Sequence, residues 1–358
     1  MEMKYFKNTC IILGLISFFN LKAQKNSKDY TSDIETFIKQ FPTNTELSVL
    51  IIDKDNSEFI GIKKQDDTVN SIDNKESIFE IGSITKVFTN ILLSSSIQHG
   101  KTTLNETLQS NFDFTIDKGD SITLQHLSNH SSGFPVLPSN MYKQMKKNPA
   151  NPYKEYTNDD LEKYLSGKID YGFKAGEKSV YSNLGMGLLG YILTKKAKKT
   201  YHQLLNETIL NPLQMNSTST NVKDKTKLVK GLNPDGSFAS NWDFTDALVG
   251  AGGIKSTTED MEKFIRKNFE NDPMYTLPLK ETFTVNKVAK IGLGWQIIES
   301  KNKKFYWHNG GTGGYRSCLV FHKETKKAVL ILSNISAFHG KSSSLDNLCF
   351  SLFKKLMK

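Results

Sequence analysis

Short apolar runs with strand character lie towards both ends of the chain, and apolar runs with helical spacing lie between them. Leu47–Ile52 and Phe59–Ile62 flank a polar turn and predict a β-hairpin. Further strand-like runs return late in the sequence, at residues 294–298, 305–307, 318–321 and 328–332. Because such runs can pair across the two ends of the chain, we predict an α+β fold with one antiparallel sheet flanked by helices.

The segment between these strands is mainly helical and rich in loops. An apolar helix is expected after Ser83, and a second one over residues 184–193. Residues 345–356 repeat apolar positions at helical spacing, which is typical of a terminal helix that packs on a core. We expect a sheet lobe from residues 24–82 and 283–358, a mainly helical lobe from residues 83–282, and a site in the cleft between them.

The first 23 residues differ in kind from the rest. Lys4 and Lys7 precede the apolar run Cys10–Phe19, and Ala23 is a small residue at a plausible cleavage point. This pattern is typical of a secretory signal peptide. The apolar run is about half the roughly 20 residues that a membrane-spanning helix needs. We therefore expect residues 1–23 to direct export, to the periplasm or outside the cell, without a membrane span.

Composition narrows the possible partners. The chain has 358 residues and a formal net charge of +10, from 47 basic and 37 acidic residues. Nearly all of the positive charge is lysine, and it is scattered rather than gathered into the basic, aromatic stripe that nucleic-acid binding needs. We expect no nucleic-acid partner and a monomer. Cys318 and Cys349 are too few for a disulfide framework, and one bridge or two buried thiols would both fit.

A serine and a lysine three residues apart follow a short strand. Residues 79–86 are typical of a strand, a glycine turn and a helix start, which puts Ser83 and Lys86 on one helix face. A serine hydroxyl needs a nearby base to act as a nucleophile, and a neutral lysine can serve. The same spacing recurs at Ser300 and Ser351. The first lies in a polar turn and the second on the predicted terminal helix, so only Ser83 has the context of a nucleophile.

Two further polar groups stand beside elements that could present them to a substrate. Tyr181 and Asn183 directly precede an apolar helix, where a tyrosine can move protons and an asparagine can bind an amide. Tyr156–Asn158 has the same form, but there it is best interpreted as a helix cap. Residues 308–314 place glycines next to a polar strand, and the Gly311 N–H could donate to an oxyanion. A structural glycine-rich hairpin is the alternative for this last group.

The histidines do not predict a metal site. His126 and His130 are four residues apart, but Gly133 and Pro135 follow at once and there is no His-Glu-x-x-His motif. We therefore expect no metal and no cofactor.

The three groups, in this order, resemble the serine β-lactamase and penicillin-binding protein superfamily. The likeness is to the branch that holds class C β-lactamases, D-alanyl-D-alanine carboxypeptidases, D-aminopeptidases and related esterases. Ser83–Lys86 is similar to its nucleophile motif, Tyr181–Asn183 to its tyrosine motif, and His308–Gly310 to its third motif. Residues 127–134 and 250–257 also resemble signatures of this branch. The resemblance covers most of the chain after residue 23.

The resemblance implies roles for these residues. Ser83 would attack an acyl carbonyl while Lys86 and Tyr181 move its proton, and water would resolve the acyl-enzyme. The backbone N–H groups of Ser83 and Gly311 would form the oxyanion hole. The substrate-binding residues would be Asn183, His308, Asn309 and Gly310. Which of Lys86 and Tyr181 is the general base stays open.

One departure from the family pattern bears on the substrate. Class C β-lactamases carry Lys-Thr-Gly in the third motif, whereas this chain has His308–Gly310, so a fixed ammonium that could bind a substrate carboxylate is missing. The implied function is an exported serine hydrolase that acts on an acyl substrate, either a β-lactam or a D-amino-acid peptide. A carboxylesterase of the same family and a non-catalytic envelope-binding protein are the alternatives.

Overall fold

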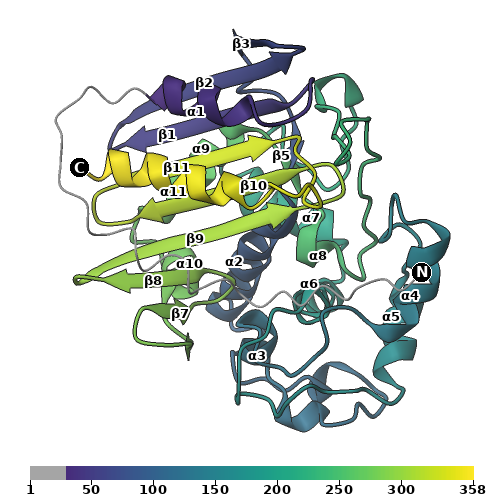
Figure 1. Ribbon diagram of the computed structural model, residues 1–358. Coiled ribbons are helices and arrows are strands. Elements are labelled where there is room, and N and C mark those ends of the chain that lie inside the picture. The colour runs from purple at the N-terminus through teal and green to yellow at the C-terminus, as the bar shows by residue number, and fades with distance from the viewer. Residues whose placement is uncertain (1–29) are drawn as a thin grey trace.

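A large antiparallel sheet forms the centre of the computed structural model, which describes residues 30–358 (Figure 1). The predicted signal peptide at residues 1–23 lies outside the described residues. The strands of the sheet are β1 (Glu46–Asp53), β2 (Asn56–Gln65), β3 (Thr68–Ile72), β6 (Phe283–Thr284), β7 (Ala289–Ile291), β8 (Gln296–Ser300), β9 (Lys303–Gly311), β10 (Arg316–His322) and β11 (Lys327–Ser333). Their order is β3-β2-β1-β11-β10-β9-β8-β7-β6.

Both ends of the chain contribute neighbouring strands. β1 pairs with β11, with Leu47 opposite Ser333 and Asp53 opposite Lys327. β1 also forms the predicted hairpin with β2. This confirms the α+β fold built on a large antiparallel sheet. β3, β6 and β7 were not predicted, because each is short and lacks a strong apolar pattern.

The central strands are apolar throughout because both faces of the sheet are covered. Alternate residues of β1 point to opposite faces: Leu50 and Ile52 join one buried cluster, while Val49 and Ile51 join the other. Helices α1 (Tyr30–Ile38) and α11 (Ser344–Leu356) cover one face (Figure 1). On this side Cys318 and Cys349 lie close together as free, buried thiols, with Cys349 Sγ 3.6 Å from Cys318 O.

The other face carries the helical part of the molecule. Its elements are β4 (Phe79–Glu80), α2 (Thr85–Gln98), α3 (Leu124–Ser128), α4 (Tyr142–Lys147), α5 (Asn158–Leu165), α6 (Asn183–Ala197), α7 (Tyr201–Leu205), α8 (Val249–Gly252), β5 (Lys255–Ser256), α9 (Thr258–Asn268) and α10 (Pro273–Thr276). Thr157 caps α5 by accepting a hydrogen bond from Asp160 N, as the sequence predicted. No helix among residues 30–358 has the length and apolar character needed to cross a membrane.

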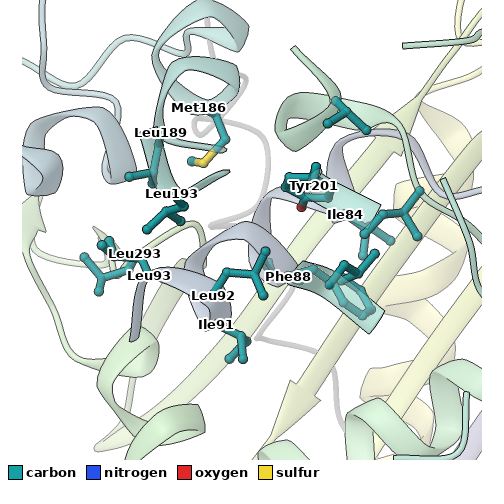
Figure 2. Packing of buried hydrophobic residues seen from close by; sticks show 14 of the residues in the cluster. Ile84, Phe88, Ile91, Leu92, Leu93, Met186, Leu189, Leu193, Tyr201 and Leu293 are labelled. Carbon is teal, nitrogen blue, oxygen red and sulfur yellow. The ribbon is translucent and has the colours of Figure 1, made fainter. Parts of the chain in front are cut away.

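α2 is the central helix of this part, and it is buried along nearly its whole length. Phe88 stacks on Phe264 of α9 with ring centroids 4.0 Å apart. Figure 2 shows Phe88 and Leu92 of α2 in the same buried cluster as Met186 and Leu189 of α6. Packing of this kind fixes the axis of α2, and with it the position of the residues in its first turn.

Candidate active site

The predicted nucleophile lies in a tight turn between β4 and α2. Gly82 has φ of +52°, a conformation that favours glycine. A Cβ on Gly82 would lie 2.5 Å from the Gly311 nitrogen of β9, so a side chain would also push the turn away from the sheet. Ser83 belongs to the 3-10 turn Gly82–Ile84, and α2 itself starts at Thr85. The turn thus brings Ser83 close to the end of β9.

Lys86 is fully buried beside Ser83, and its hydrogen-bond partners are uncharged. Its Nζ lies 3.0 Å from Ser83 Oγ, 2.8 Å from Asn183 Oδ1 and 2.6 Å from Ala251 O. Burial holds the pKa of Lys86 well below its ordinary value. A neutral amine has two N–H groups, which the two carbonyl oxygens accept. Its lone pair then faces Ser83, whose hydroxyl can donate to it.

Tyr181 approaches the nucleophile from the other side. Its hydroxyl donates to Ser83 Oγ at 2.5 Å. Its ring centroid lies 4.7 Å from Lys86 Nζ and 4.7 Å from the ring of His130. His130 Nδ1 in turn accepts a hydrogen bond from Ser182 N. Ser83 therefore sits between an acceptor for its proton and a phenol that donates to its oxygen.

The start of α6 orients the tyrosine motif. Ser182 is the N-cap of α6, and its hydroxyl accepts a hydrogen bond from Gly185 N at 2.9 Å. Asn183 follows in the first turn, where its Nδ2 donates to the hydroxyl of Tyr153 at 3.4 Å. Because Oδ1 of the same amide accepts a hydrogen bond from Lys86, one side chain links Lys86 to the loop that carries Tyr153. The structure thus brings together the first two predicted groups.

The third group supplies a neutral imidazole rather than a cation. His308 on β9 is buried, and its Nδ1 lies 2.6 Å from Asn309 O, so Nδ1 carries the proton and donates it. Its Nε2 has no hydrogen-bond partner among residues 30–358. Burial lowers the pKa of His308 to about 3. The ring therefore carries no charge at neutral pH.

The other predicted residues of this group have different surroundings. The side chain of Asn309 donates to Asp346 Oδ2 on α11 at 2.7 Å, so it is not directed to Ser83. Gly310 lies directly against the backbone just before the turn that carries Ser83, since a Cβ on Gly310 would stand 2.0 Å from Ile81 O. Gly311 faces the turn at Gly82. Two glycines in succession thus let β9 approach the nucleophile turn at van der Waals distance.

Sequence reasoning missed Arg316 at the start of β10. Its Nη2 is hydrogen-bonded to Asp346 Oδ2 at 2.5 Å, and its Nη1 lies 3.6 Å from where a Cβ on Gly311 would be. Burial raises the pKa of Asp346, and the charge of Arg316 opposes that shift. A guanidinium thus stands beside the strand that carries Gly311. The sequence did contain one signal that could have drawn attention to Arg316: Arg266 and Arg316 are the only arginines in the sequence.

Other sequence candidates lie away from this site or serve the fold. Ser300 ends β8, and Ser351 is exposed on α11. His126 serves the fold, because its Nδ1 accepts a hydrogen bond from Thr123 N in the cap of α3. His130 instead packs against Tyr181. Within residues 30–358 no cluster of three or more His, Cys, Asp or Glu side chains could hold a metal ion.

Comparison with known proteins identifies the family. A family model described as Beta-lactamase matches residues 50–346. The chain belongs to the beta-lactamase family. This family member is 26% identical over 305 residues to the D-alanyl-D-alanine-carboxypeptidase/endopeptidase AmpH of Escherichia coli K12, covering 77% of each protein. It is 23% identical over 301 residues to a beta-lactamase of the same strain, covering 73% of this chain and 76% of the relative.

Three further matches describe how much of each chain the likeness covers. The protein flp of Staphylococcus aureus MW2 is 24% identical over 277 residues, which is 72% of this beta-lactamase family chain but 53% of flp. A beta-lactamase/D-alanine carboxypeptidase of Pseudomonas syringae has a TM-score of 0.75 at 17% identity, covering 92% of this chain and 97% of that one. A class C beta-lactamase variant also gives 0.75, at 18% identity, covering 92% and 95%. These solved structures confirm the fold.

Replacing Lys86 with arginine tests whether the site needs an uncharged amine. A guanidinium stays protonated in a protein and offers no lone pair to the Ser83 hydroxyl. We expect acylation of Ser83 to slow by about 10²–10⁴. The rate of covalent labelling by a fluorescent penicillin measures this, with Lys267→Arg on α9 as a matched control and circular dichroism to check folding. Wild-type labelling of Lys86→Arg would contradict a neutral base.

Burial of His308 predicts a pH dependence of stability. Between pH 6.5 and about 3 the unfolded chain binds a proton at this residue that the folded chain does not, so the free energy of unfolding falls as the pH falls. His308→Gln removes this contribution. From pH 6.5 to 4.5, we expect wild type to lose about 2 kcal/mol more than the variant. Urea unfolding of both proteins measures the difference, and parallel pH curves would refute it.

Proposed function

We propose that this protein is an exported serine hydrolase that forms a covalent acyl-enzyme on an amide, either a β-lactam or a D-amino-acid peptide. One observation carries this proposal: Ser83 Oγ lies 3.0 Å from the buried Lys86 amine and 2.5 Å from the Tyr181 hydroxyl. An activated nucleophile needs a base within hydrogen-bond reach and a group that orients it, and both are present. Family membership supports the same chemistry.

The arrangement supports a two-step reaction. Ser83 Oγ attacks the substrate carbonyl carbon while its proton passes to Lys86 Nζ. The N–H groups of Ser83 and Gly311 donate to the oxyanion that forms. The carbon–nitrogen bond then breaks, and Tyr181 delivers a proton to the leaving nitrogen. Lys86 then returns its proton to Tyr181. Water attacks the carbonyl carbon of the resulting ester and passes a proton to Lys86, the carbon–oxygen bond to Ser83 breaks, and Ser83 Oγ takes this proton back as the acid leaves. Asn183 holds the amide on the acyl side of the substrate.

Burial of Lys86 argues against a protein that only binds. An amine taken out of water without a counter-ion costs free energy, and a binding protein gains nothing from it. A hydrolase gains a neutral base at physiological pH. The carboxylesterase alternative draws support from His308, which cannot act as the fixed cation of the Lys-Thr-Gly motif.

The position of Arg316 favours the amide substrates over simple esters. β-Lactams and peptides that end in a D-amino acid carry a free carboxylate next to the bond that breaks, whereas simple esters do not. Arg316 places a guanidinium beside Gly311, where such a carboxylate would arrive. We therefore include Arg316 among the substrate-binding residues, where it takes over the task of the missing lysine.

Location and assembly belong to the same proposal. The pattern in residues 1–23 supports export to the periplasm or beyond. We further propose that the enzyme works as a monomer without a cofactor and has no nucleic-acid partner.

Covalent labelling tests the proposed function directly. Wild type and Ser83→Ala are incubated with a fluorescent penicillin, and a chromogenic cephalosporin, a p-nitrophenyl ester and a peptide ending in D-alanyl-D-alanine are assayed in parallel. We expect labelling and turnover by wild type, and loss of both in Ser83→Ala. Equal labelling of the two proteins would exclude Ser83 as the nucleophile. No release from any substrate would favour a binding protein.

A second experiment addresses the carboxylate. The same D-alanyl-D-alanine peptide is compared with its C-terminal amide as substrates. We expect wild type to prefer the free acid by about tenfold or more in kcat/KM, because a hydrogen bond to a charged group contributes about 1.5–3 kcal/mol. Arg316→Gln should remove most of this preference, while Arg266→Gln, on α9, should keep it. An unchanged preference in Arg316→Gln would refute this assignment.

A further inference from the structure

Four aromatic rings from three separate loops form a continuous surface, which we call the aromatic shelf: Tyr153, Phe244, Trp242 and Phe338. Tyr153 stacks on Phe244 with centroids 4.2 Å apart and lies 5.3 Å from Trp242. Trp242 in turn lies 6.2 Å from Phe338. Tyr153 is buried, whereas Phe338 is 55% exposed. The shelf therefore runs from the interior out to solvent.

The inner end of the shelf touches the catalytic group. The hydroxyl of Tyr153 accepts a hydrogen bond from Nδ2 of Asn183, the residue proposed to hold the acyl-side amide. Phe244 Cζ stands 3.3 Å from where a Cβ on Gly252 would be, directly after Ala251, whose carbonyl binds Lys86. Glycine at position 252 thus leaves this space to the ring of Phe244.

The outer end of the shelf follows β9 past the expected oxyanion hole. Trp242 Nε1 lies 2.7 Å from where a Cβ on Gly313 would be, two residues after Gly311. Phe338 is held nearby, because Ser336 donates to Gly313 O and Ala337 N donates to Thr312 O. The shelf therefore extends from Asn183 to the turn that follows β9.

Two buried side chains of opposite charge fix the shelf relative to the nucleophile. Glu80 Oε1 accepts a hydrogen bond from Trp242 N at 2.9 Å, and Lys255 Nζ donates to Trp242 O at 2.9 Å. Both side chains are buried, and they sit on the paired strands β4 and β5. Glu80 precedes Ser83 by three residues. Trp242 is thus anchored to the strand that leads into the nucleophile turn.

We propose that the aromatic shelf binds the acyl group of the substrate and makes the enzyme selective for an apolar, aromatic acyl group. This inference rests on the proposed function. Tyr153 is buried and supports Phe244, so an acyl amide held by Asn183 continues along Phe244, and a ring at its end can pack against Trp242 and Phe338. A charged acyl group would lose its hydration there without gaining a partner. The outer ring of the shelf, Phe338, is 55% exposed, and a large exposed apolar side chain next to the candidate site is typical of a binding surface.

Two esters with the same leaving group test the shelf. The kcat/KM for p-nitrophenyl phenylacetate is divided by that for p-nitrophenyl acetate, which cancels differences in the amount of active enzyme. We expect a ratio of about ten or more for wild type, after correction for spontaneous hydrolysis. Trp242→Ala and Phe338→Ala should each lower this ratio about five- to tenfold, because each variant loses the free energy of one aromatic contact and of the apolar area that the contact buries.

Phe238→Ala is the matched control, because Phe238 is also a largely exposed phenylalanine (57%) but lies outside the shelf. It should leave the ratio unchanged. The proposal is overturned by a wild-type ratio near one, by unchanged ratios in both shelf variants, or by an equal fall in Phe238→Ala. Failure of the proposed function looks different: a fluorescent penicillin would then label wild type and Ser83→Ala equally.

Discussion

The burial of one amine without a counter-ion is the constraint on which the site depends. Lys86 has three close partners, and each is neutral. In water its amine would be protonated and useless as a base. Inside the protein the charged form loses its hydration without gaining a carboxylate, so the neutral form is favoured. The surrounding fold has to supply the free energy that keeps this group in place.

Two features of the fold hold Lys86 in this buried position. α2 is packed on several sides by α6 and α9, so the helix that carries Lys86 cannot turn the amine towards solvent. On the other side, Gly82 and Gly310 let the nucleophile turn contact β9 without intervening side chains. The sheet and the helical part therefore meet at Ser83, and a displacement of either would separate the hydroxyl from the strand that carries Gly311.

Charge in this site is arranged differently from the family pattern. His308 occupies the place of a lysine, but its buried ring is neutral. The guanidinium of Arg316 stands on the adjacent strand, opposite Gly311 in the β9–β10 register, and Asp346 on α11 orients it. The guanidinium of Arg316 thus belongs to β10, whereas the amine of Lys86 belongs to α2.

The sequence by itself determined the elements whose signal is local. Alternating and continuous apolar runs predicted β1, β2 and the strands β8 to β11. Tyr156–Asn158 predicted a helix cap, and the order of three motifs, through its resemblance to a known family, pointed to Ser83, Lys86 and Tyr181. Contacts between distant segments were decided by the tertiary structure alone. The charge of Lys86 and the direction of the Asn309 side chain depend on burial and on contacts between distant chain segments. The same contacts bring Arg316 and Trp242 next to the site. Hydration and electrostatic shifts depend on neighbours in space, and a linear pattern records neighbours only along the chain.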